Sequence, residues 1–337
     1  MLSFWPEYSI DKSIAFVSPN VNQSCRVSIL QVTGIRFTDE IGKYLGVPIM
    51  TERCSKRHFE FIIEKVQSRL SNWKSKNLSL AGRCTLIHSV LAGVPSYAMQ
   101  TTWLPQGTCD ALNRLSRNFL WGTNSDRKKL HLVNWKHVTK PKDQGGLGIR
   151  DARKSNIALL AKLGGQLVHE SGKVWSQVLK AKYVKNDNVL ELQPRSNASY
   201  TWRGILRSLN HVHGGFGWTI ASGREVSLWF DAWLSSEPLC LSVEEIDPNE
   251  ILWRVADIIN DEGQWVVARI KTILPTSILQ AIQSFTRDTQ PSSSDKNVWK
   301  GNSDGIITAR SLYQFITATE DTRGTRKWKW IWKLKCP

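Results

Sequence analysis

Residues 58–73, HFEFIIEKVQSRLSNW, carry a strong helical pattern. The apolar positions recur at spacings of 0, +3, +4, +7 and +11, which places them on one face of a helix. Most of the basic residues in and just before this stretch lie off that face. We therefore predict an amphipathic helix whose buried face consists of Phe59, Ile62, Ile63, Val66 and Leu70.

Two more amphipathic helices are expected after this one. A polar loop at residues 71–77 precedes Ser79, whose hydroxyl can cap the second helix. Pro95 ends that helix, because the residue before a proline avoids the helical conformation. The third helix begins near Thr108 and directs Arg114 and Arg117 outward. Three such helices with short joins predict a compact helical unit.

The flanking regions have weaker patterns. The first fifty residues are interpreted as strands and turns, with strand candidates at residues 13–17 and 44–49. Helices are expected again over residues 152–169 and 173–183.

Beyond them, the composition favours a mixed region rich in tryptophan. Residues 217–221 and 226–230 flank a glycine turn and predict a β-hairpin, and residues 251–287 are expected to be helical. The complete pattern predicts an α+β fold that is mostly α.

The positive charge of the chain is localised. The net charge is +16, and residues 51–150 hold 17 Lys and Arg against 6 Asp and Glu, a net charge of +11. A concentrated basic region of this kind is typical of proteins that bind a polyanion. A basic helix face exposed to solvent is the alternative, and composition alone does not separate the two.

Composition also excludes several classes of protein. No apolar run approaches the roughly 18–20 residues that span a bilayer, and the N-terminal residues do not resemble a signal peptide. We expect a nuclear or cytoplasmic protein that is not secreted and has no membrane partner. The six cysteines include no Cys-x-x-Cys pair, so we expect reduced, mostly buried thiols and neither a zinc knuckle nor a disulfide framework.

We find no candidate catalytic residue and no metal site. The glycines at residues 145–148 lack the Lys-Ser/Thr of a phosphate loop and are interpreted as a turn. His211 and His213 have no further ligand nearby. Two-metal enzymes need clustered carboxylates, but the sequence has no Asp-Asp pair, and the acidic residues at 244–250 are interpreted as a solvated loop. Asp231 is expected to accept a hydrogen bond from an amide or an indole N–H.

Sixteen tryptophans are present, and most fall at the strand or helix spacing of core residues. Aromatic side chains among basic residues can also stack on unpaired bases. Trp73 and Trp121 flank basic loops and are therefore the candidates for base stacking.

Several stretches resemble one family. They occur in the order KYLGVP (43–48), LSLAGR (78–83), FLWG (119–122) and PKxxGGLGI (141–149). This series resembles the part of plant non-LTR (LINE-type) retrotransposon reverse transcriptases that follows the polymerase active site. Residues 11–18 resemble the last palm strands of that family. Residues 299–313 and 328–333 resemble the start of its zinc-binding domain.

The resemblance implies four regions. Residues 1–50 would be a palm remnant with a primer-grip-like turn that includes Lys43, Tyr44 and Gly46. Residues 51–125 would be a helical thumb, residues 126–195 a basic loop and helical connector, and residues 196–337 a tryptophan-rich region leading into a truncated zinc-binding domain. The candidates for phosphate contacts are Lys74, Lys76, Arg83, Arg114, Arg117, Lys128 and Lys129. For Arg83, a structural ion pair is an equally good interpretation.

The resemblance also implies what lies outside the chain. The Tyr-x-Asp-Asp catalytic segment would precede residue 1, the Cys/His zinc ligands would follow residue 337, and a ribonuclease H domain would lie elsewhere. We therefore expect a fragment that is no enzyme by itself and has no cofactor, although the intact family enzyme uses magnesium. Its expected partner is an RNA or DNA template–primer, bound without sequence preference. The alternative is a domesticated host protein that acts as a protein-interaction module.

Overall fold

The computed structural model describes residues 13–17, 20–38, 42–44, 47–48, 55–74, 78–123, 129–169, 172–184, 188–235, 237–289, 293–302 and 304–319. The chain forms two compact units, Met1–Glu60 and Phe61–Pro337. Each unit is considered by itself.

The first unit contains two small two-stranded sheets. Strands β1 (Ile14–Phe16) and β2 (Arg36–Thr38) pair in parallel, and helix α1 (Gln23–Thr33) connects them. Strands β3 (Lys43–Tyr44) and β4 (Val47–Pro48) pair antiparallel, and the 3-10 helix η2 (Lys56–Phe59) follows them. The predicted strands at residues 13–17 and 44–49 are therefore present, although the second is divided into two.

Helix α1 corrects the expectation that the first fifty residues form only strands and turns. The Asn22 side chain accepts the amide of Cys25 at its start, and Gly34 ends it with a φ of 67°. Its apolar residues occupy no single face and none of its residues is buried, so the 3.6-residue periodicity that reveals a helix is missing. Of the four cysteines that the structure describes, Cys109 is buried, Cys84 and Cys240 are half-buried and Cys25 is exposed, which corrects the expectation of mostly buried thiols.

The three predicted helices open the second unit. They are α2 (Glu60–Lys74), α3 (Leu80–Leu86), which continues as a π-helical turn, η3 (Ile87–Leu91), and α5 (Gln106–Trp121). Short helix α4 (Ser96–Thr101) lies between the last two. Ser79 caps α3 through the amide of Gly82, as predicted. Side chains from α2, η3 and α5 surround one apolar cavity of about 100 Å³, so these helices form a shared core.

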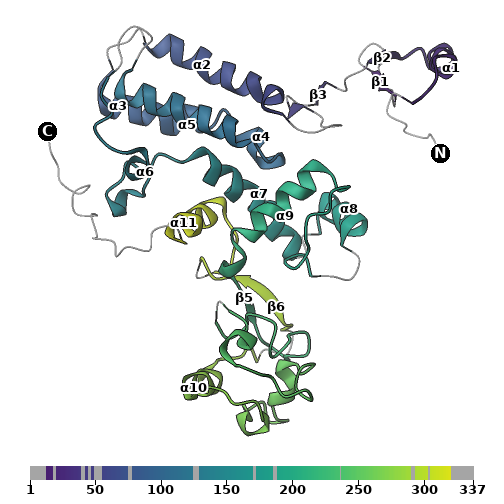
Figure 1. Cartoon of the computed structure of the whole chain (residues 1–337), viewed down its shortest axis with the longest axis vertical. Helices are drawn as coiled ribbons and strands as arrows, with labels where there is room; N and C mark the ends of the chain where they lie inside the picture. Colours follow the sequence, from purple (N-terminus) through teal and green to yellow (C-terminus); the bar gives the residue numbers. More distant parts are fainter. Residues whose placement is uncertain are drawn as a thin grey trace, which may run out of the picture. The chain divides into compact units, whose positions relative to one another are not determined.

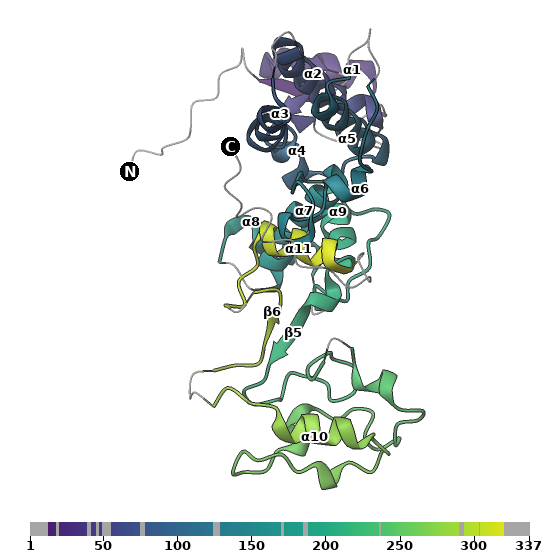
Figure 2. The ribbon, with the colours of Figure 1, turned by 90° about the vertical axis from the view of Figure 1, so that its left-hand side faces the viewer.

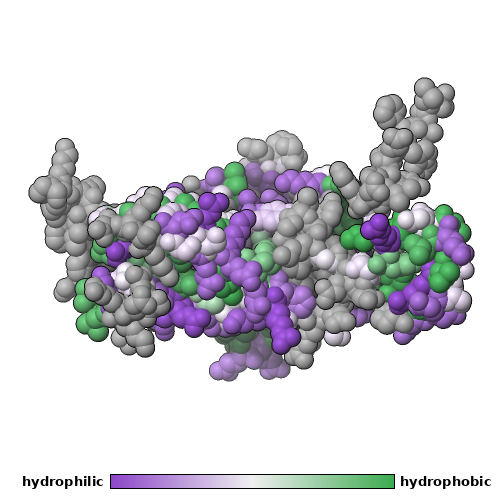
Figure 3. Space-filling view, turned by 90° about the horizontal axis from the view of Figure 1, so that it is seen from above, coloured by the Kyte–Doolittle hydropathy of each residue, from purple (hydrophilic) through white to green (hydrophobic). Residues whose placement is uncertain are grey.

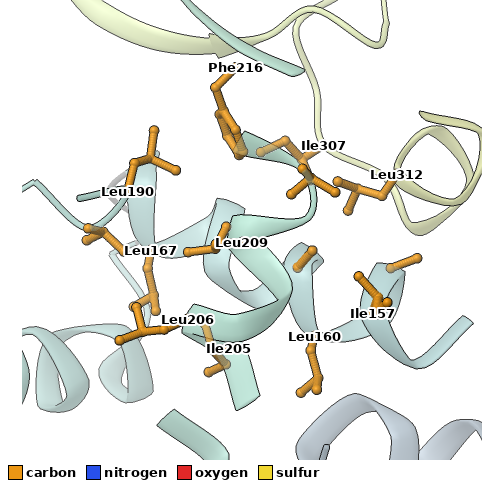
Figure 4. Packing of buried hydrophobic residues seen from close by; sticks show 14 of the residues in the cluster. Ile157, Leu160, Leu167, Leu190, Ile205, Leu206, Leu209, Phe216, Ile307 and Leu312 are labelled. Carbon is orange, nitrogen blue, oxygen red and sulfur yellow. The ribbon is translucent and has the colours of Figure 1, made fainter. Parts of the chain in front are cut away.

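Helix α7 (Ala152–Val168) is the centre of the second unit. It packs against α4, α5, α9 (Tyr200–Asn210) and α11 (Ala309–Thr319), and Figure 1 shows it among them. Figure 4 shows apolar side chains of this core, which come from α7, α9, strand β5, α11 and the segments that precede α9 and α11. Close packing depends on Gly164, because a Cβ atom there would lie 2.6 Å from the Leu209 side chain.

Buried Asn156 joins α7 to the loop between α4 and α5. Its side-chain oxygen accepts the amide of Leu104 at 2.9 Å, and its nitrogen donates to the carbonyls of Met99 (2.9 Å) and Thr102 (2.8 Å). The Arg153 guanidinium also donates to Asn156, and it lies 4.7 Å from the Trp103 ring centroid. Long-range polar bonds therefore fix this loop.

Strands β5 (Phe216–Thr219) and β6 (Lys296–Trp299) pair antiparallel and run side by side in Figure 2. The predicted hairpin of residues 217–221 and 226–230 is therefore wrong, because the partner of the first strand lies about eighty positions further on. Residues 226–230 form no named strand and contribute only an isolated bridge between Ser227 and Arg254. Local spacing cannot reveal such a distant partner.

Residues 220–295 form a lobe with its own apolar core, which includes Trp229, Trp233 and Ile282. The helical prediction for residues 251–287 is mostly wrong: regular structure there is limited to η7 (Val255–Ile258), η8 (Val267–Arg269) and α10 (Thr276–Ser284). The remaining short helices of the second unit are α6 (Trp135–Val138), η4 (Lys142–Gln144), α8 (Val174–Tyr183), η5 (His213–Gly215) and η6 (Leu239–Ser242).

Two buried carboxylates fix the turns of this lobe. Asp295 accepts the amides of Ala221 (2.7 Å), Gly223 (2.9 Å) and Glu225 (3.2 Å) and the hydroxyl of Ser222. Burial would raise its pKa, but these hydrogen bonds outweigh burial and hold the pKa of Asp295 below its ordinary value.

Glu250 is the second of these carboxylates and is completely buried. It accepts the amide of Lys271 and the hydroxyl of Thr272. The interpretation of residues 244–250 as a solvated acidic loop is therefore wrong for Glu250.

The fold is α+β and mostly α, as predicted. Among the described residues, no helix combines the length and the apolar character that crossing a membrane requires.

Candidate nucleic-acid interface

Three helix ends meet at one side of the second unit. The last turn of α2, the start of α3 and the end of α5 lie together at the left of Figure 1. The Trp73 ring, at the end of α2, lies 5.8 Å from the Phe119 ring of α5, with the planes tilted by 44°. Trp73 is half-buried, so part of the indole remains accessible beside the basic residues considered next.

Arg83 lies against the end of α5. Gly122 ends this helix with a φ of 68°, and a Cβ atom there would lie 2.9 Å from the Arg83 guanidinium carbon. The free carbonyls at a helix C-terminus carry a partial negative charge, which favours a cation. The Arg83 side chain makes no hydrogen bond or ion pair with a residue that the structure describes. Its structural role is therefore packing on Gly122, and the predicted ion pair is not seen among these residues.

Trp121 brings a second segment to the same helix end. Its ring lies nearly parallel to that of His131, with centroids 6.4 Å apart, and His131 is 3.4 Å from the Thr123 hydroxyl. This contact positions residues 129–131 next to the end of α5. Lys129 is exposed there. The structure thus places Arg83 near the same helix end as Trp121 and Lys129, which lie about forty positions further along the chain.

The outer face of α5 adds two arginines one turn apart. Arg114 is exposed and Arg117 is half-buried, with its Nε atom buried and unpaired within the described part of the chain. Figure 3 shows hydrophilic residues across the middle of the face that is seen from above. Helix α2 exposes Lys65, Gln67, Ser68 and Arg69. These side chains could carry phosphate contacts without any change in the buried core.

Other predicted residues lie outside the described side chains. Gly46, Lys76 and Lys128 are not among the described residues. Lys43, Tyr44 and Lys74 are described only by their backbone: the first two form β3 and the third ends α2. Strand β3 pairs antiparallel with β4, and residues 45–46 of the predicted turn lie outside the described residues.

The glycine-rich stretch at residues 141–149 forms a turn rather than a phosphate loop. Gly145 and Gly148 have φ values of 85° and 68°, and a Cβ atom at Gly146 would lie 2.8 Å from the His137 carbonyl oxygen. The His88 ring donates from Nε2 to the carbonyl of Leu147 at 3.1 Å. The turn therefore packs on the π-helical turn η3, and His88 is a structural residue that its sequence position did not reveal.

A cavity of about 470 Å³ lies between the lobe and the helical core: Phe230 and Asp231 of the lobe line it together with Trp218 of β5. Asp231 accepts the amide of Ser227, as predicted. Burial raises the pKa of its carboxyl, and the Ser227 amide and the Arg254 charge only partly oppose this increase. No group of three or more His, Cys, Asp or Glu side chains within the described ranges could hold a metal ion.

No protein-family model matches the chain. Two proteins of Arabidopsis thaliana are similar to it. "Putative ribonuclease H protein At1g65750" is 35% identical over 297 residues, which cover 86% of this chain and 48% of that protein. "Uncharacterized mitochondrial protein AtMg00310" is 31% identical over 145 residues, which cover 43% of this chain and 94% of that protein. The chain thus spans about half the length of the first relative.

Proposed function

The chain belongs to the same family as the uncharacterized mitochondrial protein AtMg00310, and we propose that it is a segment of a plant retrotransposon-derived reverse transcriptase that binds nucleic acid. In this proposal the helices over residues 56–121 act as a thumb that contacts the phosphate backbone of a template–primer duplex. The segment binds and positions nucleic acid, and the polymerase chemistry belongs to other parts of the intact enzyme.

One observation carries this proposal. Two of the stretches on which the family resemblance rests, residues 78–83 and 119–122, meet in space through Arg83 and Gly122. Around this contact lie Trp73, Trp121 and Lys129, and Arg114 and Arg117 lie on the same helix. Cations next to half-buried aromatic rings supply both of the contacts that nucleic acids offer, phosphate charge and base faces.

The name of the longer relative agrees with this proposal. It is called a ribonuclease H protein, and a ribonuclease H domain is one of the parts that the family resemblance implies outside this chain. The magnesium ions of an intact reverse transcriptase would be bound at its polymerase active site, which the family resemblance also implies outside this chain. This chain would accordingly need no cofactor for binding.

A charge-matched pair of variants tests the thumb assignment. Arg114→Ala/Lys129→Ala removes two exposed cations of the interface, and Lys162→Ala/Arg207→Ala removes two exposed cations from α7 and α9. We expect the first variant to bind a fluorescent primer–template duplex about ten-fold more weakly, with the slope of log K against log salt reduced by about 1.8. Equal effects of the two variants would contradict the assignment.

A second function, protein binding by the lobe, is supported by exposed apolar side chains around the cavity of about 470 Å³. Phe230 is 55% and Leu252 is 88% exposed, and both line it. Exposed apolar groups of this kind favour a protein partner. In the full-length chain, Leu252→Glu should abolish recovery of such a partner and leave duplex binding unchanged. Retention of the partner by this variant would exclude this surface.

A further inference from the structure

Another cavity, of about 270 Å³, lies between the end of α8 and the start of α9. The Tyr183 and Trp202 rings are stacked beside it, with centroids 4.9 Å apart and planes 13° from parallel. The Tyr183 hydroxyl accepts the amide of Ser199, and the Ser199 hydroxyl accepts the amide of Trp202. The aromatic wall is therefore held rigidly by the α9 cap.

The opening of this cavity is basic. Lys182 and Arg195 are exposed and line it, together with the side-chain amides of Gln193 and Asn197. No carboxylate is among the described residues that line it. The Lys182 ammonium lies 5.3 Å from the Tyr183 ring centroid, so a positive charge and an aromatic face are adjacent.

One acidic residue, Glu191, lies close to the cavity lining in sequence and already accepts a hydrogen bond. Glu191 precedes the wall of the cavity and accepts the side chain of Asn188 at 3.3 Å. Arg195, Gln193 and Asn197 make no side-chain hydrogen bond with any residue in the described ranges. Their donors and acceptors are thus available to a ligand.

We propose that this cavity binds an unpaired nucleotide of a single strand, with its phosphate on Lys182 and Arg195 and its base at the Tyr183–Trp202 wall. A cation pair attracts the phosphate, an aromatic face suits any base, and the two amides can pair with base edges. The site extends the proposed nucleic-acid binding to a region outside residues 51–150. It would hold template strand beyond the duplex that the thumb contacts.

The test uses the full chain and two fluorescent probes, a single-stranded oligo(dT) of twenty nucleotides and a blunt primer–template duplex. Lys182→Ala/Arg195→Ala should weaken oligo(dT) binding about ten-fold and reduce its salt slope by about 1.4. Duplex binding should remain within two-fold. Lys162→Ala/Arg207→Ala is the charge-matched control, and all variants should melt at the same temperature.

A second pair of variants tests the aromatic wall. Tyr183→Leu should weaken oligo(dT) binding by about five-fold or more, because a stacking ring is lost, and Tyr183→Phe, which keeps the ring and loses only the hydroxyl, should weaken it clearly less. If Lys182→Ala/Arg195→Ala and the control Lys162→Ala/Arg207→Ala weaken oligo(dT) binding equally, the cavity is not the binding site. That result would leave the thumb proposal intact provided Arg114→Ala/Lys129→Ala still weakens the duplex. Absence of binding to either probe at low salt would overturn both proposals.

Discussion

The helical core around α7 and the lobe of residues 220–295 are stabilised in different ways. In the core, regular helices bury continuous apolar faces against one another. In the lobe, regular structure is short, and buried aromatic rings and two buried carboxylates hold irregular turns. The core thus depends on periodic patterns along the chain, whereas the lobe depends on individual side chains that bind backbone groups far away in sequence.

The largest effect is expected where the core itself depends on one polar residue. Asn156→Ala leaves the buried amide of Leu104 and the carbonyls of Met99 and Thr102 without partners. We expect the free energy of unfolding to fall by about 3–5 kcal/mol, measured by urea unfolding with far-UV circular dichroism. Asn210→Ala, at an exposed position of α9, is the control. A loss as small as that of the control would contradict the role of Asn156.

A smaller and local effect is expected in the lobe. Asp295→Ala removes the acceptor of three backbone amides and one hydroxyl, which should destabilise the lobe by about 2–3 kcal/mol. The part of the tryptophan fluorescence that comes from the lobe, which includes Trp229 and Trp233, should then change at lower urea than the helical circular dichroism signal. Coincident transitions shifted by equal amounts would show that core and lobe are not stabilised separately.

Acid should act on the lobe through the same residue. The pKa of Asp295 is lowered in the folded state, so its contribution to stability is complete above the unfolded pKa of about 3.9. The contribution is lost as the pH falls through the lower folded value. Between pH 5 and 3 the fluorescence-detected transition of the wild type should therefore weaken more than that of Asp295→Ala. Parallel pH profiles for the two proteins would exclude this carboxylate as the cause.

The smallest effect is expected at the interface end of α5. Gly122→Ala places a side chain in a left-handed conformation and displaces the Arg83 guanidinium, which should cost about 1–2 kcal/mol. Gly172→Ala is the control, because a Cβ atom there meets nothing within 4 Å. Thermal melting of both variants measures the difference. Equal melting temperatures would show that Arg83 does not depend on this close approach.

The same contrast explains what could be predicted from the sequence. The helices that contain Ile62 and Leu112 and the helix that Ser79 caps were predicted because apolar spacing and caps are local signals. The pairing of β5 with β6 and the binding of Asp295 to Ala221, 74 residues away, leave no local signal. Burial of Glu250 was missed for the same reason.

Some features of the candidate interface could be predicted from the sequence and others could not. Arg114 and Arg117 were predicted to point outward: Arg114 is exposed, but Arg117 is half-buried with its Nε atom buried. The proximity of Arg83 to Gly122 could not be deduced from spacing, because it depends on how α3 and α5 pack. The cavity at Tyr183 was missed because its residues come from a helix end and a loop without periodicity.

The measurement that most directly tests the central claim is the affinity of the intact chain for two primer–template duplexes of unrelated sequence between 50 and 200 mM salt. Backbone binding by the interface cations predicts equal affinities for the two duplexes. It also predicts a linear fall of log K with log salt, by about 0.9 for each phosphate contact. Strong preference for one sequence, an affinity independent of salt, or no binding at 50 mM would contradict the account.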